Sequence, residues 1–161
     1  MTKSIHLSLD AMGGDNAPEI IVKGAAQSKI RHPNVKFSFF GNKNKLLPLI
    51  SSIEILKNSD IIHTNEFIDA NEKPSIAVRK GKNSSMGMAI QSVKSGHADA
   101  IISAGNTGAL MAMTKLFLRP IEGISRPAIA AYFPTITGES CMLDLGANIE
   151  CDAKNLVQFA F

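Results

Sequence analysis

The chain has 161 residues, of which 45% are hydrophobic and 19% charged, a balance typical of globular proteins. The 17 Lys and Arg residues against 14 Asp and Glu give a net charge of +3. Spread over the whole chain, this charge is a weak argument for nucleic acid binding, which requires a clustered basic face. No apolar run is long enough to cross a bilayer, and no signal peptide is recognised. Cys141 and Cys151 are too few for a zinc site or a disulfide framework, so we expect free thiols in a reducing cytosol.

The first half of the chain alternates strand-like and helix-like segments. Residues 4–9 predict a strand, because Ile5, Leu7 and Leu9 alternate with polar residues. A turn with two adjacent glycines follows, and a helix is expected over residues 18–30, with a proline in its first turn. Further along we expect strands over residues 35–40 and 59–64 and a short helix over residues 46–53.

The second half continues the alternation after residues 65–74, which are polar and irregular and to which no element is assigned. Two serines predict the cap of a helix over residues 84–95, and a short apolar strand is expected over residues 99–104. The next helix ends at Leu118 and is apolar nearly all round, so we expect it to be deeply buried. The remaining predicted elements are strands over residues 127–133 and 139–144 and an apolar helix over residues 153–161.

Strands alternating with helices indicate an α/β fold, a doubly wound, mainly parallel sheet with helices on both faces. We predict a single α/β domain over residues 1–161. The last predicted helix stays apolar to its end and carries no stop signal. Since chains rarely end inside a buried element, we expect this one to be part of a longer protein, or a chain whose second half is supplied elsewhere.

Three loops with glycine and small polar residues follow predicted strands, over residues 10–16, 103–108 and 144–148. In an open parallel sheet such loops lie together at the carboxyl ends of the strands, where ligands bind. Glycines let a ligand approach the backbone, and N–H groups at a helix start favour an anion, so residues 103–108 are the best candidate for a phosphate cradle. Tight turning alone would explain any one loop, whereas three in the same position favour function.

Charged side chains give weaker signals. Residues 79–82 place three cations beside a glycine, which suits phosphate recognition, although a solvated surface turn explains the run more simply. Asp10, Asp15 and Asp144 are candidates for metal ligands or bases, with turn and cap roles equally favoured. The four histidines follow no metal-ligand spacing. The sequence contains no P-loop, G-x-G-x-x-G or G-x-S-x-G motif, which disfavours a P-loop ATPase, an ordinary dinucleotide fold and a serine hydrolase.

Four ordered motifs carry a resemblance that covers essentially the whole chain. They are LDAMGGDNAPE over residues 9–19, the segment from Pro74 through Arg79-Lys80 to Met86, ADAIISAGNTGAL over residues 98–110, and LDLGAN over residues 143–148. In this order they strongly resemble bacterial phosphate acyltransferases, the acyl-ACP:phosphate enzymes of phospholipid synthesis. Members of that family are longer, so the resemblance implies that this chain is the truncated N-terminal half of a longer protein.

The resemblance implies transfer of a fatty acyl group from acyl carrier protein to inorganic phosphate. The acyl phosphate product would be used by a membrane glycerol-3-phosphate acyltransferase. It implies a fold similar to phosphate acetyltransferases and to isocitrate and isopropylmalate dehydrogenases. It further implies a homodimer that needs no metal or other cofactor and is cytoplasmic, with peripheral association with the membrane.

Dianionic phosphate can itself be the nucleophile, so the protein has to position it and to stabilise the tetrahedral oxyanion with N–H donors. The expected catalytic residues are Ser103, Asn106, Thr107 and Asp144. The expected substrate-binding residues are Asp10, Gly13, Gly14, Asp15, Arg79, Lys80, Ser84, Gly105, Gly108 and Asn148. Arg79 and Lys80 would balance phosphate charge or meet the acidic carrier protein, and Asp144 and Asn148 would orient ligands.

Two alternatives stay open. One is another enzyme of the same fold, either a CoA-dependent phosphate acyltransferase or a decarboxylating dehydrogenase, although the carboxylate cluster of the dehydrogenase cannot be assembled from this sequence. The other is a non-catalytic half-protein that binds phosphate or a partner without turnover and exposes an apolar patch where the missing half would pack.

Overall fold

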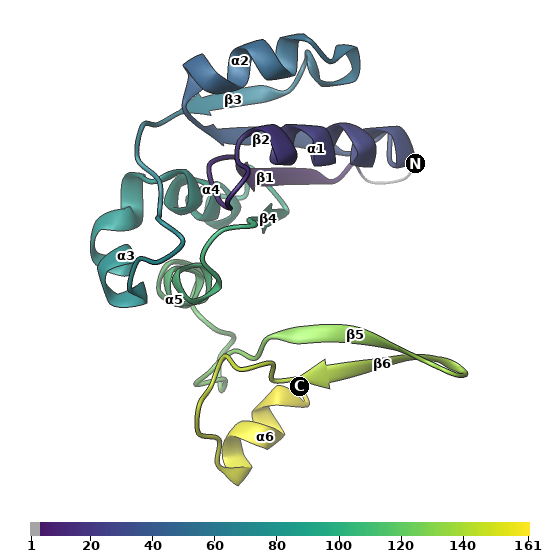
Figure 1. Cartoon of the computed structure of the whole chain (residues 1–161). Helices are drawn as coiled ribbons and strands as arrows, with labels where there is room; N and C mark the ends of the chain where they lie inside the picture. Colours follow the sequence, from purple (N-terminus) through teal and green to yellow (C-terminus); the bar gives the residue numbers. More distant parts are fainter. Residues whose placement is uncertain (1–3) are drawn as a thin grey trace. The chain divides into compact units, whose positions relative to one another are not determined.

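The predicted alternation of strands and helices builds a parallel sheet in the first part of the chain (Figure 1). The structure is a computed structural model and describes residues 4–161. It divides into a first unit that ends at Leu118 and a second unit over Arg119–Phe161. The single α/β domain expected over residues 1–161 stays a prediction. Residues 1–3 lie outside the described residues.

Among residues 4–118 the strands form one sheet in the order β3-β2-β1-β4, with every neighbouring pair parallel. The strands are β1 (His6–Asp10), β2 (Lys36–Gly41), β3 (Asp60–His63) and β4 (Ala100–Ile102). The helices are α1 (Glu19–Arg31), α2 (Lys43–Ser51), α3 (Pro74–Lys80), α4 (Ser85–Lys94) and α5 (Thr107–Leu118), with short 3-10 helices η1 (Glu54–Leu56) and η2 (Gly81–Asn83). The predicted parallel α/β fold is confirmed.

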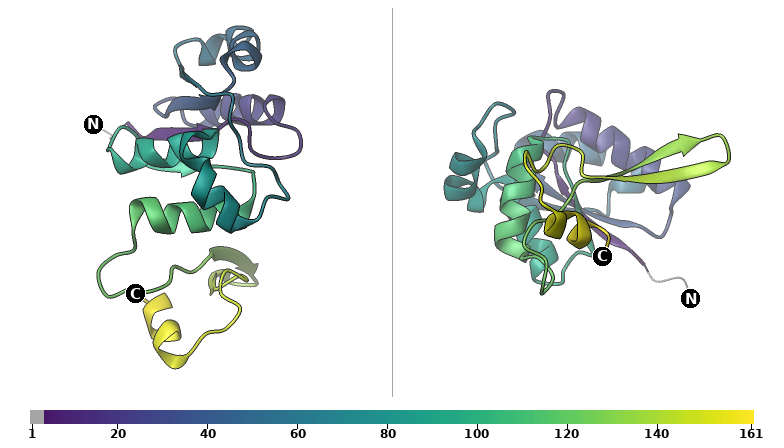
Figure 2. Two further views of the ribbon diagram at one scale, coloured as in Figure 1. Left: turned by 90° about the vertical axis from the view of Figure 1, so that its left-hand side faces the viewer. Right: turned by 90° about the horizontal axis from the view of Figure 1, so that it is seen from below.

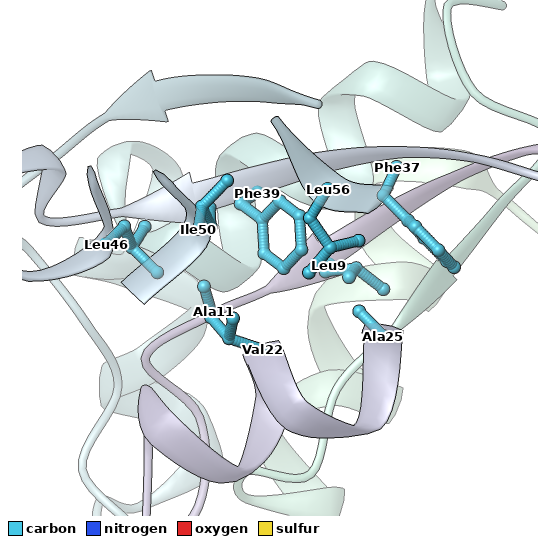
Figure 3. Packing of buried hydrophobic residues seen from close by; sticks show 9 residues of the cluster. All are labelled: Leu9, Ala11, Val22, Ala25, Phe37, Phe39, Leu46, Ile50 and Leu56. Atoms are coloured by element: carbon cyan, nitrogen blue, oxygen red, sulfur yellow. The ribbon is translucent and has the colours of Figure 1, made fainter. Parts of the chain in front are cut away.

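Side chains of β1 alternate between the two faces of the sheet. Leu9 points into the core with α1, α2 and η1, which Figure 3 shows around the buried ring of Phe39. Ser8 points to the opposite face, where its hydroxyl donates to the Ala89 carbonyl of α4 at 3.0 Å and to the Ala100 carbonyl at 3.1 Å. Helices therefore cover both faces of the sheet, as predicted for a doubly wound fold.

A second core joins the helices that precede and follow β4. Its buried residues are Ile68, Ala77, Met86, Ile90, Ala109 and Met113. They come from α3, α4, α5 and the segment before α3, and α3 and α5 lie side by side (Figure 2). Helix α3 is not among the predicted elements, although Pro74 at its first position is a favourable start signal.

The expectation that α5 is deeply buried is wrong for much of its surface. Ala109 and Met113 are fully buried, whereas Leu116 is 55% exposed. Only the stripe that meets α3 and α4 packs within the first unit. Hydrophobic composition all round a helix therefore overstated its burial.

The second unit contains β5 (Ala130–Thr135), β6 (Gly138–Leu143) and α6 (Ala153–Phe159). β5 and β6 pair antiparallel in a sheet of their own. Two residues connect them, and parallel strands would need a crossover of about a dozen residues or more. The prediction that residues 144–148 follow a strand of the parallel sheet is therefore wrong.

The apolar helix predicted over residues 153–161 is present as α6, but its apolar side chains are not buried. Leu156 and Val157 are exposed, while Gln158 is buried. The Gln158 side-chain oxygen accepts hydrogen bonds from the Ser125 N–H at 3.0 Å and the Ser125 hydroxyl at 2.8 Å. A polar contact thus holds α6 within the second unit.

Candidate functional site

Asp10 ends β1 and forms the centre of a buried polar cluster. Its carboxylate is only 2% exposed and carries two short hydrogen bonds, one on each oxygen. The Ser85 hydroxyl, at the start of α4, donates to Oδ1 at 2.6 Å. The Ser103 hydroxyl, just after β4, donates to Oδ2 at 2.7 Å. One carboxylate therefore joins the ends of two adjacent strands to the start of a helix.

Burial raises the pKa of the Asp10 carboxyl above its ordinary value. Hydrogen bonds from the Ser85 and Ser103 side chains and from the Met12 and Gly13 N–H groups stabilise the carboxylate and offset part of that rise in pKa. No cation is needed for this arrangement, because each carboxylate oxygen has its own hydroxyl donor.

Glycines allow the loops after β1 and β4 to lie against each other. A Cβ on Gly13 would stand 2.4 Å from Asp10 Oδ2 and 3.0 Å from Ser103 Oγ. Gly14 has a φ of +101°, and a Cβ there would stand 2.9 Å from the Ala104 carbonyl oxygen. The predicted meeting of residues 10–16 and 103–108 is confirmed, and side chains at these glycines would prevent it.

Asn106 caps α5 and holds a distant segment at the same time. Its Oδ1 accepts the Ala109 N–H at 2.9 Å, and its Nδ2 donates at 2.9 Å to the carbonyls of both Ala70 and Glu72. The side chain predicted to contact phosphate or the oxyanion is thus engaged within the protein in this structure. Sequence reasoning missed the 69–72 segment as its partner, because nothing local connects residues more than thirty positions apart.

Backbone donors remain at the start of α5. The Gly105 N–H donates to Ser103 Oγ at 3.1 Å. Within residues 4–161, by contrast, no acceptor meets the N–H groups of Asn106, Thr107 and Gly108. Thr107 and Gly108 are exposed. Three open N–H groups at the start of a 12-residue helix favour an anion.

The cations of the predicted site lie at the end of α3 and not in a turn. Arg79 and Lys80 occupy its last turn and are both exposed. Lys80 lines a cavity of about 290 Å³ together with Glu66, Glu72 and Ser84. This corrects the interpretation of residues 79–82 as a surface turn, since the first two belong to a helix.

Ser84 and Asp15 have different surroundings. Ser84 is buried and caps α4, because its hydroxyl oxygen accepts the Gly87 N–H at 3.1 Å and its hydroxyl donates to the Gly81 carbonyl at 2.6 Å. Asp15 is exposed in the loop after β1. Ser84 therefore supports the α4 start beside Ser85, and Asp15 presents a carboxylate to solvent.

Asp144 and Asn148 lie in the second unit and bind each other. Asp144 Oδ2 accepts the Asn148 N–H at 2.8 Å and its Nδ2 at 3.0 Å, and Oδ1 accepts the Ile129 N–H at 2.9 Å. Desolvation alone would raise the pKa of Asp144, but the donors Ile129, Asn148 and Ala147 outweigh it and lower that pKa. These bonds hold the 144–148 loop in shape.

A larger hollow, of about 1190 Å³, lies elsewhere on the first unit. It is lined by residues of β2, β3 and α4 and by His6 and His97, and by none of the residues predicted for the site. Size alone does not place function there, because neither the residues of the glycine loops nor those with the open N–H groups line this hollow. Among the described residues, no group of three His, Cys, Asp or Glu side chains is arranged to hold a metal ion. In the same residues no helix is long and apolar enough to span a membrane.

The chain is similar to known proteins over nearly its whole length. Residues 5–161 match the family model described as "Fatty acid synthesis protein". The chain is 52% identical over 161 residues to a phosphate acyltransferase of Rhodospirillum centenum, covering 99% of this chain and 45% of that protein. It is 49% identical over 161 residues to that of Rhodospirillum rubrum and 48% identical over 158 residues to that of Rhizobium meliloti, covering 46% of each and 99% and 97% of this chain. The chain spans about half the length of the curated relatives it matches.

Proposed function

The chain belongs to the fatty acid synthesis protein family, and from that premise we propose that it transfers a fatty acyl group from acyl carrier protein to inorganic phosphate. One observation carries the proposal. The N–H groups of Asn106, Thr107 and Gly108 point from the start of α5 without an acceptor in residues 4–161. A phosphate dianion is a matching ligand for such a helix start.

In the proposed reaction a phosphate oxygen attacks the thioester carbonyl carbon. The C–O bond forms, the C–S bond breaks, and the carrier thiolate leaves and takes up a proton. Phosphate bound at residues 106–108 would be held against the thioester, which raises its effective concentration. An N–H donor that meets the tetrahedral oxyanion is worth about 3 kcal/mol in such reactions. No protein nucleophile is required.

The other predicted residues take supporting roles in this proposal. Ser103 and Gly105 shape the phosphate loop, and Gly13, Gly14 and Asp15 form its neighbouring wall. Exposed Arg79 and Lys80 would meet phosphate or the acidic carrier protein. Asp144 and Asn148 would orient ligands by holding the 144–148 loop.

The setting of the reaction is also part of this proposal, and it rests on the resemblance carried by the sequence motifs. Acyl phosphate would pass to a membrane glycerol-3-phosphate acyltransferase, and the enzyme would act as a cytoplasmic homodimer associated peripherally with the membrane. We propose no nucleic acid partner.

A turnover assay on the 161-residue chain tests the proposal. The chain is mixed with palmitoyl-acyl carrier protein and phosphate, and release of the carrier thiol is followed, with the Rhodospirillum rubrum relative in parallel. We expect release that depends on phosphate. Release with palmitoyl-CoA but not with the carrier protein would favour a CoA-dependent acyltransferase. No release beside an active relative would refute turnover by this chain and favour a non-catalytic half.

Substitutions at Thr107 test the role of the backbone donors. Thr107→Pro removes one open N–H, and proline fits the first position of a helix. Thr107→Ala keeps the N–H and loses only the hydroxyl. We expect Thr107→Pro to reduce turnover at low phosphate about 10- to 100-fold, as for loss of one hydrogen bond to a charged ligand, and Thr107→Ala to reduce it less. Equal losses would argue that the hydroxyl acts and the N–H does not.

A further inference from the structure

The buried carboxylate of Asp10 does not belong to the proposed phosphate loop over residues 103–108. It lies behind Ser103, the first residue of that loop. Its exposed fraction is 2%, so substrate does not reach it in this structure. Its Oδ2 accepts the Ser103 hydroxyl at 2.7 Å, and Ser103 Oγ in turn accepts the Gly105 N–H at 3.1 Å. A continuous chain of hydrogen bonds therefore runs from the end of β1 into the loop before α5.

This chain fixes the direction of the Ser103 hydroxyl. An ionised carboxylate can only accept, so the Ser103 proton points to Asp10 and its lone pairs point to the loop. The Gly105 N–H occupies one of those lone pairs. The open N–H groups begin one residue later, at Asn106, and α5 begins at Thr107.

Close packing around the carboxylate leaves this arrangement little freedom. A Cβ on Gly105 would stand 3.2 Å from both Gly13 Cα and Ser103 Oγ, and a Cβ on Gly13 would strike Asp10 Oδ2. On the opposite side, the Ser85 hydroxyl binds Oδ1 at 2.6 Å. The Ser103 hydroxyl on Oδ2 is thus the contact through which the carboxylate acts on the loop, whereas the Ser85 hydroxyl links the other oxygen to α4.

We propose that Asp10 is a positioning residue that acts through Ser103 to align the open N–H groups of residues 106–108 for phosphate. It does not contact the substrate, in contrast to the substrate-binding role expected from the sequence. The inference rests on the proposed function for the identity of the ligand. Alignment of donors matters because a site about 0.5 Å out of place loses much of its binding.

The test measures phosphate binding to the 161-residue chain by titration calorimetry and stability by urea unfolding. Asp10→Asn and Ser103→Ala should each weaken phosphate binding about tenfold, which equals about 1.4 kcal/mol. The double variant should be no weaker than either single variant, because both break the same chain of hydrogen bonds. Ser103→Thr keeps a hydroxyl and should restore the affinity.

Ser85→Ala is the matched control. It removes the other hydrogen bond to the same carboxylate and leaves Ser103 and its loop in place. We expect it to lower stability and to change the phosphate dissociation constant less than twofold. An effect on affinity as large as that of Ser103→Ala would overturn the proposal, because a general loss of packing would then explain both.

Other results would overturn the proposal too. One is a double variant whose loss of phosphate affinity is the product of the losses in Asp10→Asn and Ser103→Ala. The others are an unchanged phosphate affinity in Ser103→Ala and a wild-type chain that binds no phosphate. If Asp10→Asn does not fold, Ser103→Ala and Ser103→Thr still decide. A chain that binds phosphate in this pattern but releases no carrier thiol would refute the proposed transfer and leave Asp10 as a positioning residue.

Discussion

Replacing Gly13 by alanine should destabilise the first unit, whereas the same change at Gly24 should stabilise it. The alanine Cβ at position 13 would stand 2.4 Å from Asp10 Oδ2 and 3.0 Å from Ser103 Oγ. Gly24 lies exposed within α1, and a Cβ there meets nothing within 4 Å. The two substitutions add the same methyl group to opposite environments.

The size of the effect follows from what must move. An unstrained contact between carbon and oxygen needs roughly 1 Å more than the 2.4 Å available. Asp10 cannot retreat by that distance without stretching its bonds to Ser85 and Ser103. Overpacking of this kind costs about 1–3 kcal/mol, and hydrogen bonds to a charged group contribute about 1.5–3 kcal/mol each. We expect a loss of about 3 kcal/mol for Gly13→Ala and a gain of about 0.5–1 kcal/mol for Gly24→Ala.

Urea unfolding followed by circular dichroism at 222 nm measures both free energies. Thermal unfolding gives a second measure, since 1 kcal/mol shifts Tm by about 2–4 °C in a chain of this length. We expect Tm to fall by roughly 6–12 °C for Gly13→Ala and to rise by a few degrees for Gly24→Ala. If Gly13→Ala and the wild type had equal free energies of unfolding, the close contact between Gly13 and the Asp10 carboxylate would be refuted.

Three further predictions concern the core, the Asn106 side chain and the two carboxyl groups with shifted pKa. Phe39→Ala, which empties a fully buried site in the core, should cost about 3–5 kcal/mol in urea unfolding, and a loss below 1 kcal/mol would contradict that packing. Asn106→Asp should keep the α5 cap but set a carboxylate against two carbonyls. The rate of amide hydrogen exchange at residues 69–72 should therefore rise while α5 stays protected. Asn106→Ala should raise the exchange rate in both segments. Unchanged exchange would argue that Asn106 does not hold the 69–72 segment. The pH dependence of stability should have opposite signs at the two carboxyl groups with shifted pKa. Because the pKa of Asp10 is raised in the folded state, ionisation of this carboxyl opposes folding. The free energy of unfolding of Asp10→Asn should therefore increase relative to that of the wild type as pH rises above 3.8. Because the pKa of Asp144 is lowered in the folded state, its carboxylate stabilises the fold above pH 3.8. The loss of unfolding free energy in Asp144→Asn should therefore shrink as pH falls below that value. If urea unfolding gave the same pH dependence for the wild type and both variants, both assignments would be contradicted.

Local patterns were sufficient for most of the first unit. Alternating Leu7 and Leu9 fixed which face of β1 meets the core, and the serines before α4 marked its start. The glycine loops after β1 and β4 were placed at one edge because parallel strands bring their carboxyl ends together. The ordered motifs pointed to the same family that the comparisons found.

The partners within the site depended on the tertiary structure. Asp10 binds side chains 75 and 93 residues away, and no local pattern specifies which hydroxyl meets which carboxylate oxygen. Asn106 looked like a free donor, yet its amide binds carbonyls of the 69–72 segment. Each of these contacts forms only when segments far apart in sequence are packed together.

By itself, the sequence determined the parallel α/β architecture, its glycine loops and the family, since these depend on side-chain period and on motifs of a few residues. Three features could be seen only in the folded chain: residues 144–148 follow an antiparallel hairpin, α5 keeps an exposed stripe, and Asp10 is buried behind Ser103. The physical reason is that burial and hydrogen-bond partners are set by packing between distant segments, which local sequence does not encode.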